Sequence, residues 1–100
     1  MSRASRLKRT RNNREKLIAH LMCNPCMDCG ETDWQVLQFD HREPCEKLYN
    51  VANMVSHKPW LEMLWEMEKC DVRCANCHTR KTALDRGYYT YLGDVPPRMQ

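Results

Sequence analysis

Three short groups of residues carry side chains that can bind metals or move protons. In chain order they are Cys26-Met-Asp-Cys29, Asp40-His41 and Cys74-Ala-Asn-Cys77-His78. Thiolates suit zinc, whereas carboxylate and imidazole groups also serve as ligands of catalytic cations or as proton acceptors. The order predicts one metal cage built from both ends of a small domain, with an aspartate and two histidines beside it.

The two Cys-X2-Cys pairs predict a structural zinc site. Zinc in such sites takes four tetrahedral ligands and keeps no open position. The four predicted ligands are Cys26, Cys29, Cys74 and Cys77. Cys23 and Cys26 have the same spacing, so the first pair could instead be formed by these two. We favour Cys29 over Cys23 because Gly30 follows it and frees the backbone to turn tightly around a metal.

A closed thiolate site leaves any catalysis to other residues, and Asp40, His41 and His78 are the candidates. Carboxylate oxygens bind Mg²⁺, while Mn²⁺ and Ni²⁺ also accept imidazole. A histidine can deprotonate water because its ordinary pKa lies near neutrality. Hydrolysis of a phosphodiester needs both a base and a cation. Alternatively, Asp40 is a turn or cap residue and His78 a surface residue beside the zinc.

The same residues resemble a known family, the HNH endonucleases, which have the ββα-metal fold, and in particular their zinc-stapled members from phages and bacteria. The resemblance covers about Cys26 to Thr82. It lies in Cys26-Met-Asp-Cys29-Gly30, in Leu37-Gln-Phe-Asp40-His41-Arg-Glu-Pro44 and in Lys69-Cys-Asp-Val-Arg-Cys74-Ala-Asn-Cys77-His78-Thr-Arg-Lys-Thr82. It implies a metal-dependent endonuclease that hydrolyses DNA by nicking or cutting. His41 would be the general base, and Asp40 and His78 would hold a catalytic Mg²⁺, Mn²⁺ or Ni²⁺.

One position departs from the family pattern. Many members carry an Asn about nine residues before the last His, where it orients the loop that bears the base, but this chain has Lys69 there. Asn76 is the favoured substitute, and Asn50 and Asn53 are the others. An Asn between two zinc ligands can also simply bond the backbone of the knuckle.

Positive charge is concentrated at the start of the chain. Residues 1 to 16 hold seven basic side chains against one acid, and the remaining 84 residues hold nine basic and twelve acidic ones. Such an arm attracts phosphates with little regard to sequence. The predicted nucleic-acid contacts are Arg3, Arg6, Lys8, Arg9, Arg11 and Arg14, with Arg42, Arg80 and Lys81 as phosphate clamps nearer the site. A solvated helix face is the alternative for these charges.

The elements that must position these residues can be predicted from periodicity and turn residues. We expect a basic amphipathic helix over residues 5–22, a strand over 34–39 that delivers Asp40 and His41 at its end, and a central helix from Pro59 to about Lys69. A brief strand at Val72 and Arg73 and a helix over 77–86, which Gly87 ends, complete the expected core.

The predicted fold is a small, zinc-stabilised α+β domain, with a ββα-metal core and an added basic N-terminal helix and central helix. Its parts are a basic arm (1–22), the zinc-bound nuclease core (23–87) and a C-terminal tail (88–100). In the central helix the apolar residues, including Leu61 and Trp65, are expected to face the core.

The function class follows from charge, cysteines and resemblance together. With seven cysteines and no membrane-length apolar run, we expect a reducing compartment, the cytoplasm, which is the host's if the chain is phage-encoded, and no membrane partner. The expected partner is DNA, with a larger phage or host DNA-processing complex as a possible second one. The alternative functions are a non-catalytic zinc module that binds nucleic acid or a protein partner and, far behind, a thiol redox sensor that uses Cys23 and Cys70.

Overall fold

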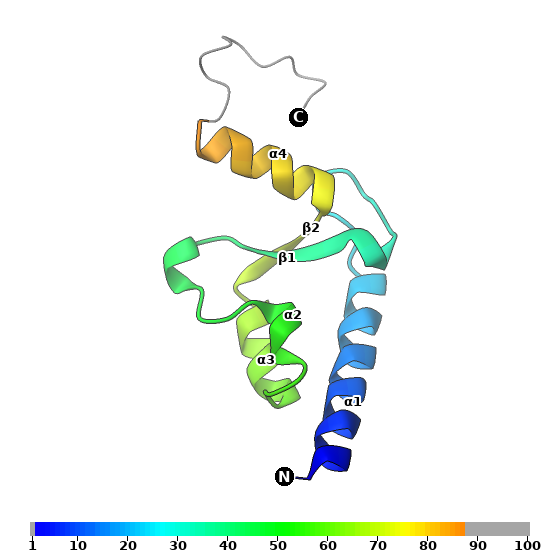
Figure 1. Ribbon diagram of the computed structural model, residues 1–100. Coiled ribbons are helices and arrows are strands. Elements are labelled where there is room, and N and C mark those ends of the chain that lie inside the picture. The colour runs from blue at the N-terminus through cyan, green and yellow to red at the C-terminus, as the bar shows by residue number, and fades with distance from the viewer. Residues whose placement is uncertain (1, 88–100) are drawn as a thin grey trace.

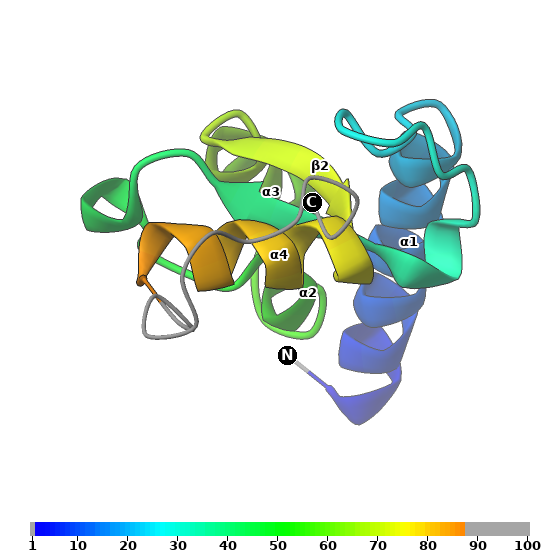
Figure 2. The same cartoon turned by 90° about the horizontal axis from the view of Figure 1, so that it is seen from above.

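The computed structural model describes residues 2–87 and forms a small α+β domain (Figure 1). Two antiparallel strands, β1 (Leu37–His41) and β2 (Cys70–Cys74), lie at its centre. Helix α4 (Ala75–Asp85) covers one side of the strand pair, and α2 (Val51–Met54) and α3 (Trp60–Met67) lie on the other. Helix α1 (Arg3–Met22) runs alongside (Figure 2). The expected tail at 88–100 lies outside the described residues.

Helix α1 confirms the predicted basic helix and begins where a cap allows it. The Ser2 side chain accepts a hydrogen bond from the backbone N–H of Ser5, which satisfies one of the free N–H groups of the first turn. Leu17 and Leu21 are buried near the other end of the helix. Midway along, the buried Asn13 amide donates to the carbonyls of Val55 (3.1 Å) and Lys58 (2.8 Å). No helix in the described part of the chain is long and apolar enough to cross a membrane.

Strand β1 begins later than the sequence predicts. Trp34–Val36 forms a 3₁₀ turn, η1, because the Asp33 carboxylate accepts from the backbone N–H of Gln35 and turns the chain there. The extended segment is therefore Leu37–His41, and Asp40 and His41 are its last two residues. The prediction that the strand delivers these two side chains at its end is confirmed.

Strand β2 is longer than the sequence predicts, and helix α4 begins earlier. Strand β2 covers five residues and pairs in full register with β1, from Leu37 opposite Cys74 to His41 opposite Cys70. Helix α4 follows at once, with Cys74 as its N-cap. Gly87 ends this segment at a φ of 67°, a left-handed conformation that costs glycine little.

Two apolar clusters stabilise the fold, and Phe39 packs against both. One joins the helices through the buried residues Leu17, Val51, Met54, Val55, Met63 and Met67. The other surrounds the cysteines and contains Leu21, Cys26, Leu37, Cys74 and Cys77. Strand β1 is thus held between a helical core and a cysteine core.

The expectation that the whole apolar stripe of α3 faces the core is wrong for two residues. Leu61 and Trp65 are 58% and 60% exposed. The helix has only eight residues, and Met63 and Met67 fill its inward side. Residues 61 and 65 are one turn apart and share the outward side.

Candidate active site and metal centre

Four cysteines meet beside the strand pair in an arrangement that can hold zinc. The sulfur atoms of Cys26, Cys29, Cys74 and Cys77 all lie within 4.8 Å of one another. The Cys29 and Cys74 sulfurs are 3.7 Å apart, and tetrahedral zinc with bonds of about 2.3 Å separates its thiolates by about 3.8 Å. All four are free thiols, and Cys23 is exposed outside the group. The structure thus groups Cys29, and not Cys23, with the other three cysteines.

The local backbone explains how the first pair forms. Gly30 adopts a φ of 80° and its N–H donates to the Cys26 carbonyl (2.9 Å), which closes a tight loop around the two thiols. The N–H of Met27 donates to the Val72 carbonyl (2.9 Å) and ties this loop to β2. The second pair uses the first turn of α4, where the N–H of Cys77 lies 3.4 Å from the Cys74 sulfur.

The thiols favour a bound cation on electrostatic grounds. Burial opposes ionisation of Cys26, but hydrogen bonds from nearby backbone groups lower its pKa to about 6. Burial and the neighbouring thiols raise the pKa of Cys77 to about 12. Ionisation of one thiol thus opposes ionisation of the next, because two thiolates repel each other. A divalent ion would displace the thiol protons and offset this repulsion.

Asp40 and His78 approach each other across the interface between β1 and α4. The Asp40 Oδ1 and His78 Nδ1 atoms are 3.5 Å apart. Nδ1 of His78 is buried and has no hydrogen-bond partner among the described residues. Two neighbouring ligands of an octahedral Mg²⁺ lie about 3 Å apart, so a small side-chain movement would let both atoms bind one cation. Because buried polar atoms are normally hydrogen-bonded, the unpaired His78 nitrogen supports a cation as its partner.

His41 points to the other side of β1, toward α3. Its Nε2 lies 2.7 Å from Oε2 of Glu66, and the two side chains are only 7% and 3% exposed. Because side chains alternate between the two faces of a strand, the His41 ring and the Asp40 carboxylate point to opposite faces of β1. Asp40, His41 and His78 nevertheless line one cavity of about 480 Å³ at the end of the strand, here called the strand-end cavity, together with Lys47, Lys81 and Thr82.

Arg73 connects the candidate cation site with the loop of residues 26–30 that carries the first cysteine pair. Its Nη1 donates to Asp40 Oδ2 (2.7 Å) and its Nε donates to Asp28 Oδ2 (2.7 Å). Asp28 lies between Cys26 and Cys29, so one guanidinium orients residues of both sites. Because Arg73 occupies Oδ2 of Asp40, it leaves Oδ1 facing His78. The sequence predicted Arg73 only as part of a strand and assigned it no role in a site.

None of the residues considered as substitutes for the expected Asn forms a hydrogen bond with the His41 ring among residues 2–87. Asn76 is exposed on the first turn of α4. Asn50 and Asn53 line a second cavity of about 380 Å³ that His41 also borders. The residue bonded to His41 is Glu66, which no sequence motif indicated. Lys69, at the departing position, donates to the other oxygen of that carboxylate (3.0 Å).

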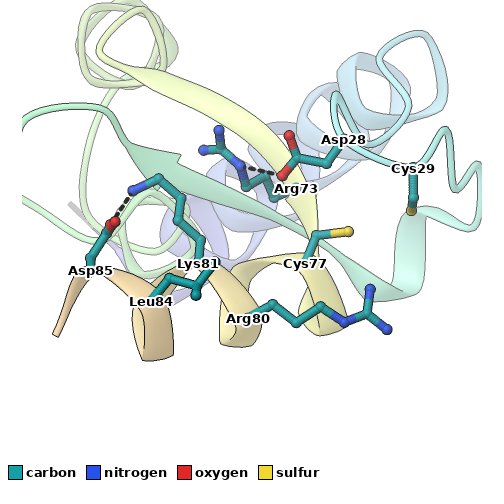
Figure 3. A pocket seen from close by; sticks show the side chains of 8 residues that line it. All are labelled: Asp28, Cys29, Arg73, Cys77, Arg80, Lys81, Leu84 and Asp85. Carbon is teal, nitrogen blue, oxygen red and sulfur yellow. Dashed lines mark hydrogen bonds and ion pairs between the residues drawn. The ribbon is translucent and has the colours of Figure 1, made fainter. Parts of the chain in front are cut away.

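The predicted phosphate clamps differ in how they are held. The Arg42 guanidinium donates to the carbonyls of Cys70 (2.9 Å) and Glu68 and to Asp71 (3.1 Å), so it fastens the end of β1. Lys81 pairs with Asp85 at 2.7 Å, an interaction that raises the pKa of the lysine. Figure 3 shows the pocket between α4 and the loop of residues 26–30, with Arg80 and Lys81 on its α4 side. The volume of this pocket is about 420 Å³.

The basic arm is the outer part of α1. Its predicted contacts are exposed except Arg9, which is half-buried. Arg11 pairs with Glu15 at 3.2 Å on the exposed surface, which leaves most of its charge available to other partners.

The chain was compared with known protein families, curated proteins and solved structures. No protein-family model, curated protein or solved structure matches the chain.

Proposed function

We propose that the protein is a metal-dependent endonuclease of the HNH type that hydrolyses phosphodiester bonds in DNA. The observation that carries the proposal is the pair of Asp40 Oδ1 and the buried, unpartnered His78 Nδ1, 3.5 Å apart. They line a cavity that the candidate base His41 shares. The order of β1, β2 and α4, with a four-cysteine cluster at the start of the helix, is also the order that the ββα-metal fold requires.

The residues of the site divide the work of hydrolysis. Mg²⁺, Mn²⁺ or Ni²⁺ held by Asp40 and His78 would supply the positive charge that a phosphate needs as negative charge develops on its oxygens. Arg73 fixes the orientation of the Asp40 carboxylate. His41 accepts the proton of the attacking water, and Glu66 holds its ring. The four cysteines would hold a structural zinc that keeps β2 and α4 against the loop of residues 26–30.

The substrate class rests on charge. The exposed basic face of α1 and the side chains of Arg80 and Lys81 offer cations to a polyanion such as DNA. These contacts read the backbone and not the bases. A phage or host DNA-processing complex would then provide the choice of target.

A plasmid assay tests the proposal. Supercoiled DNA is incubated with zinc-loaded protein, with and without Mg²⁺, Mn²⁺ or Ni²⁺, beside the variants His41→Ala and His57→Ala. His57 is exposed and lies outside the strand-end cavity, so its variant is the matched control. We expect metal-dependent nicking that His41→Ala lowers about a hundred- to ten-thousand-fold and that His57→Ala leaves unchanged.

The exposed basic arm also supports a second function, a non-catalytic zinc module that binds nucleic acid. The same experiment separates the two. If the wild-type protein retards the plasmid in a gel but leaves it supercoiled with every cation, the module is the correct description. Nicking that persists in His41→Ala would point to a contaminating nuclease.

A further inference from the structure

Glu66 is the most buried carboxylate among residues 2–87, and neither the proposed family pattern nor the composition assigns it a role. It lies in the last turn of α3 and is 2% exposed. A buried carboxylate is costly unless hydrogen bonds and opposite charges compensate it. The groups that contact the Glu66 carboxylate therefore indicate its role.

Four donors surround the Glu66 carboxylate. Oε2 lies 2.7 Å from His41 Nε2 and accepts from the backbone N–H groups of Leu48 (3.1 Å) and Tyr49 (3.4 Å). Oε1 accepts from Lys69 Nζ (3.0 Å). Burial opposes ionisation, but these hydrogen bonds, that of Lys69 foremost, lower the pKa of Glu66 to about 2. Glu66 is thus a charged acceptor at neutral pH.

The charge of this carboxylate determines which ring nitrogen of His41 carries the proton. An ionised carboxylate can only accept a hydrogen bond. The nitrogen 2.7 Å away must therefore be a donor, so Nε2 of His41 is protonated. In the neutral ring the lone pair is then on Nδ1, the nitrogen opposite the Glu66 contact.

We infer that Glu66 is a positioning residue for His41. The Glu66 carboxylate holds the imidazole in the Nε2–H tautomer and keeps Nδ1 as the basic nitrogen of the ring. The use of that nitrogen to deprotonate water rests on the proposed function. The tautomer and orientation do not. The same division of labour, in which a buried carboxylate orients a histidine base, operates in hydrolases with a nucleophile, a histidine and an acid.

Lys69 completes the arrangement from the position where the family pattern has an Asn. Its Nζ bridges Oε1 of Glu66 and the Glu46 carbonyl (3.0 Å). Glu66 meanwhile binds the backbone at residues 48 and 49. The Glu66–Lys69 pair therefore fastens both the base and the loop that follows it, which is the task that the missing Asn was expected to perform.

Glu66→Gln tests the inference because it keeps the shape of the side chain and removes its charge. A glutamine amide donates as well as accepts, so it no longer dictates the tautomer of His41. Glu62→Gln is the matched control, since Glu62 lies one turn earlier on α3 and its side chain is 44% exposed. Circular dichroism and zinc content should be equal in the three proteins before they are compared.

Two measurements are made on each protein. Nitrogen-15 spectra of the histidine side chains report the tautomer of His41, and we expect Nε2–H in the wild type and in Glu62→Gln but an Nδ1–H population in Glu66→Gln. Plasmid nicking gives kcat and KM. We expect Glu66→Gln to lower kcat about a hundredfold with KM changed less than about twofold, because the Glu66 side chain is buried and offers no surface for a substrate to bind.

The spectra decide the inference whether or not the protein proves to be a nuclease. An Nδ1–H tautomer in the wild type, or an unchanged spectrum in Glu66→Gln, overturns it. If the spectra follow expectation and no protein nicks DNA, the proposed function fails while the positioning role of Glu66 stands. Normal kcat in a Glu66→Gln protein whose tautomer has shifted would show that His41 is not the base.

Discussion

Replacing Arg73 by alanine should remove a large part of the stability of the domain. The guanidinium is 10% exposed and lies 2.7 Å from Asp40, whose side chain is 11% exposed. Loss of one partner from such a buried pair leaves an uncompensated charge and costs about 3–5 kcal/mol. The other two pairs add less, because Asp28 is 43% exposed and screened by water, and the Asp71 oxygen is 3.7 Å from the guanidinium. An exposed pair contributes about 0–1 kcal/mol.

These magnitudes define the measurement. A domain of this length has a free energy of unfolding of about 5–15 kcal/mol, so a loss of about 3–5 kcal/mol in Arg73→Ala is at least about a fifth of it. The corresponding fall in Tm is at least about 12 °C. Urea and thermal unfolding, followed by tryptophan fluorescence in equal excess zinc, would give both values.

Two variants serve as controls for this prediction. Arg80→Ala removes an exposed arginine from α4 and should change the free energy of unfolding by less than about 0.5 kcal/mol. Asp28→Asn should cost below about 1 kcal/mol. The reasoning is refuted if Arg73→Ala costs less than about 1 kcal/mol, or if Asp28→Asn costs as much as Arg73→Ala.

Three further predictions concern zinc, acid and salt. Chelation or Cys29→Ser should unfold the domain, because structural zinc contributes about 10–16 kcal/mol in comparable sites. Cys23→Ser should leave near-ultraviolet circular dichroism and zinc content unchanged, since Cys23 is outside the cluster. A folded, zinc-free wild type would contradict this prediction. Glu66, with its pKa lowered from 4.5 to about 2, should contribute about 3 kcal/mol above pH 4.5 that is lost as pH falls toward 2; urea titrations should show the gap between wild type and Glu66→Gln closing over that range, and a constant gap would contradict it. Arg6→Gln with Lys8→Gln should reduce the slope of log affinity for duplex DNA against log salt by about 1.8, and an unchanged slope would exclude both side chains from the interface.

Local signals made the four-cysteine cluster and the ends of the strands predictable. Each cysteine pair is set by a spacing of three positions, and Gly30 identifies the tight turn that follows the first pair. Asp40 and His78 stand directly at the end of a strand and the start of a helix, so their approach followed from the expected order of elements.

The buried polar groups could not be predicted in the same way. Glu66, Arg73 and Asn13 belong to residue types that are mostly exposed, and nothing beside them in the chain distinguishes them. Their partners lie 25, 33 and 42 positions away. Only the folded chain brings these groups together, and each then fixes the relation between two elements.

The two halves of the zinc cluster have a consequence for synthesis of the chain. Cys29 and Cys74 are 45 residues apart. At about 5–20 residues per second, a ribosome needs about 2–9 s to add the segment between them. During that time Cys26 and Cys29 emerge without Cys74 and Cys77, and Cys23 offers a further thiol at the same spacing from Cys26. A zinc ion bound by these early thiols would have to change ligands when the second pair arrives, so we expect the yield of folded protein to rise with the zinc available during translation.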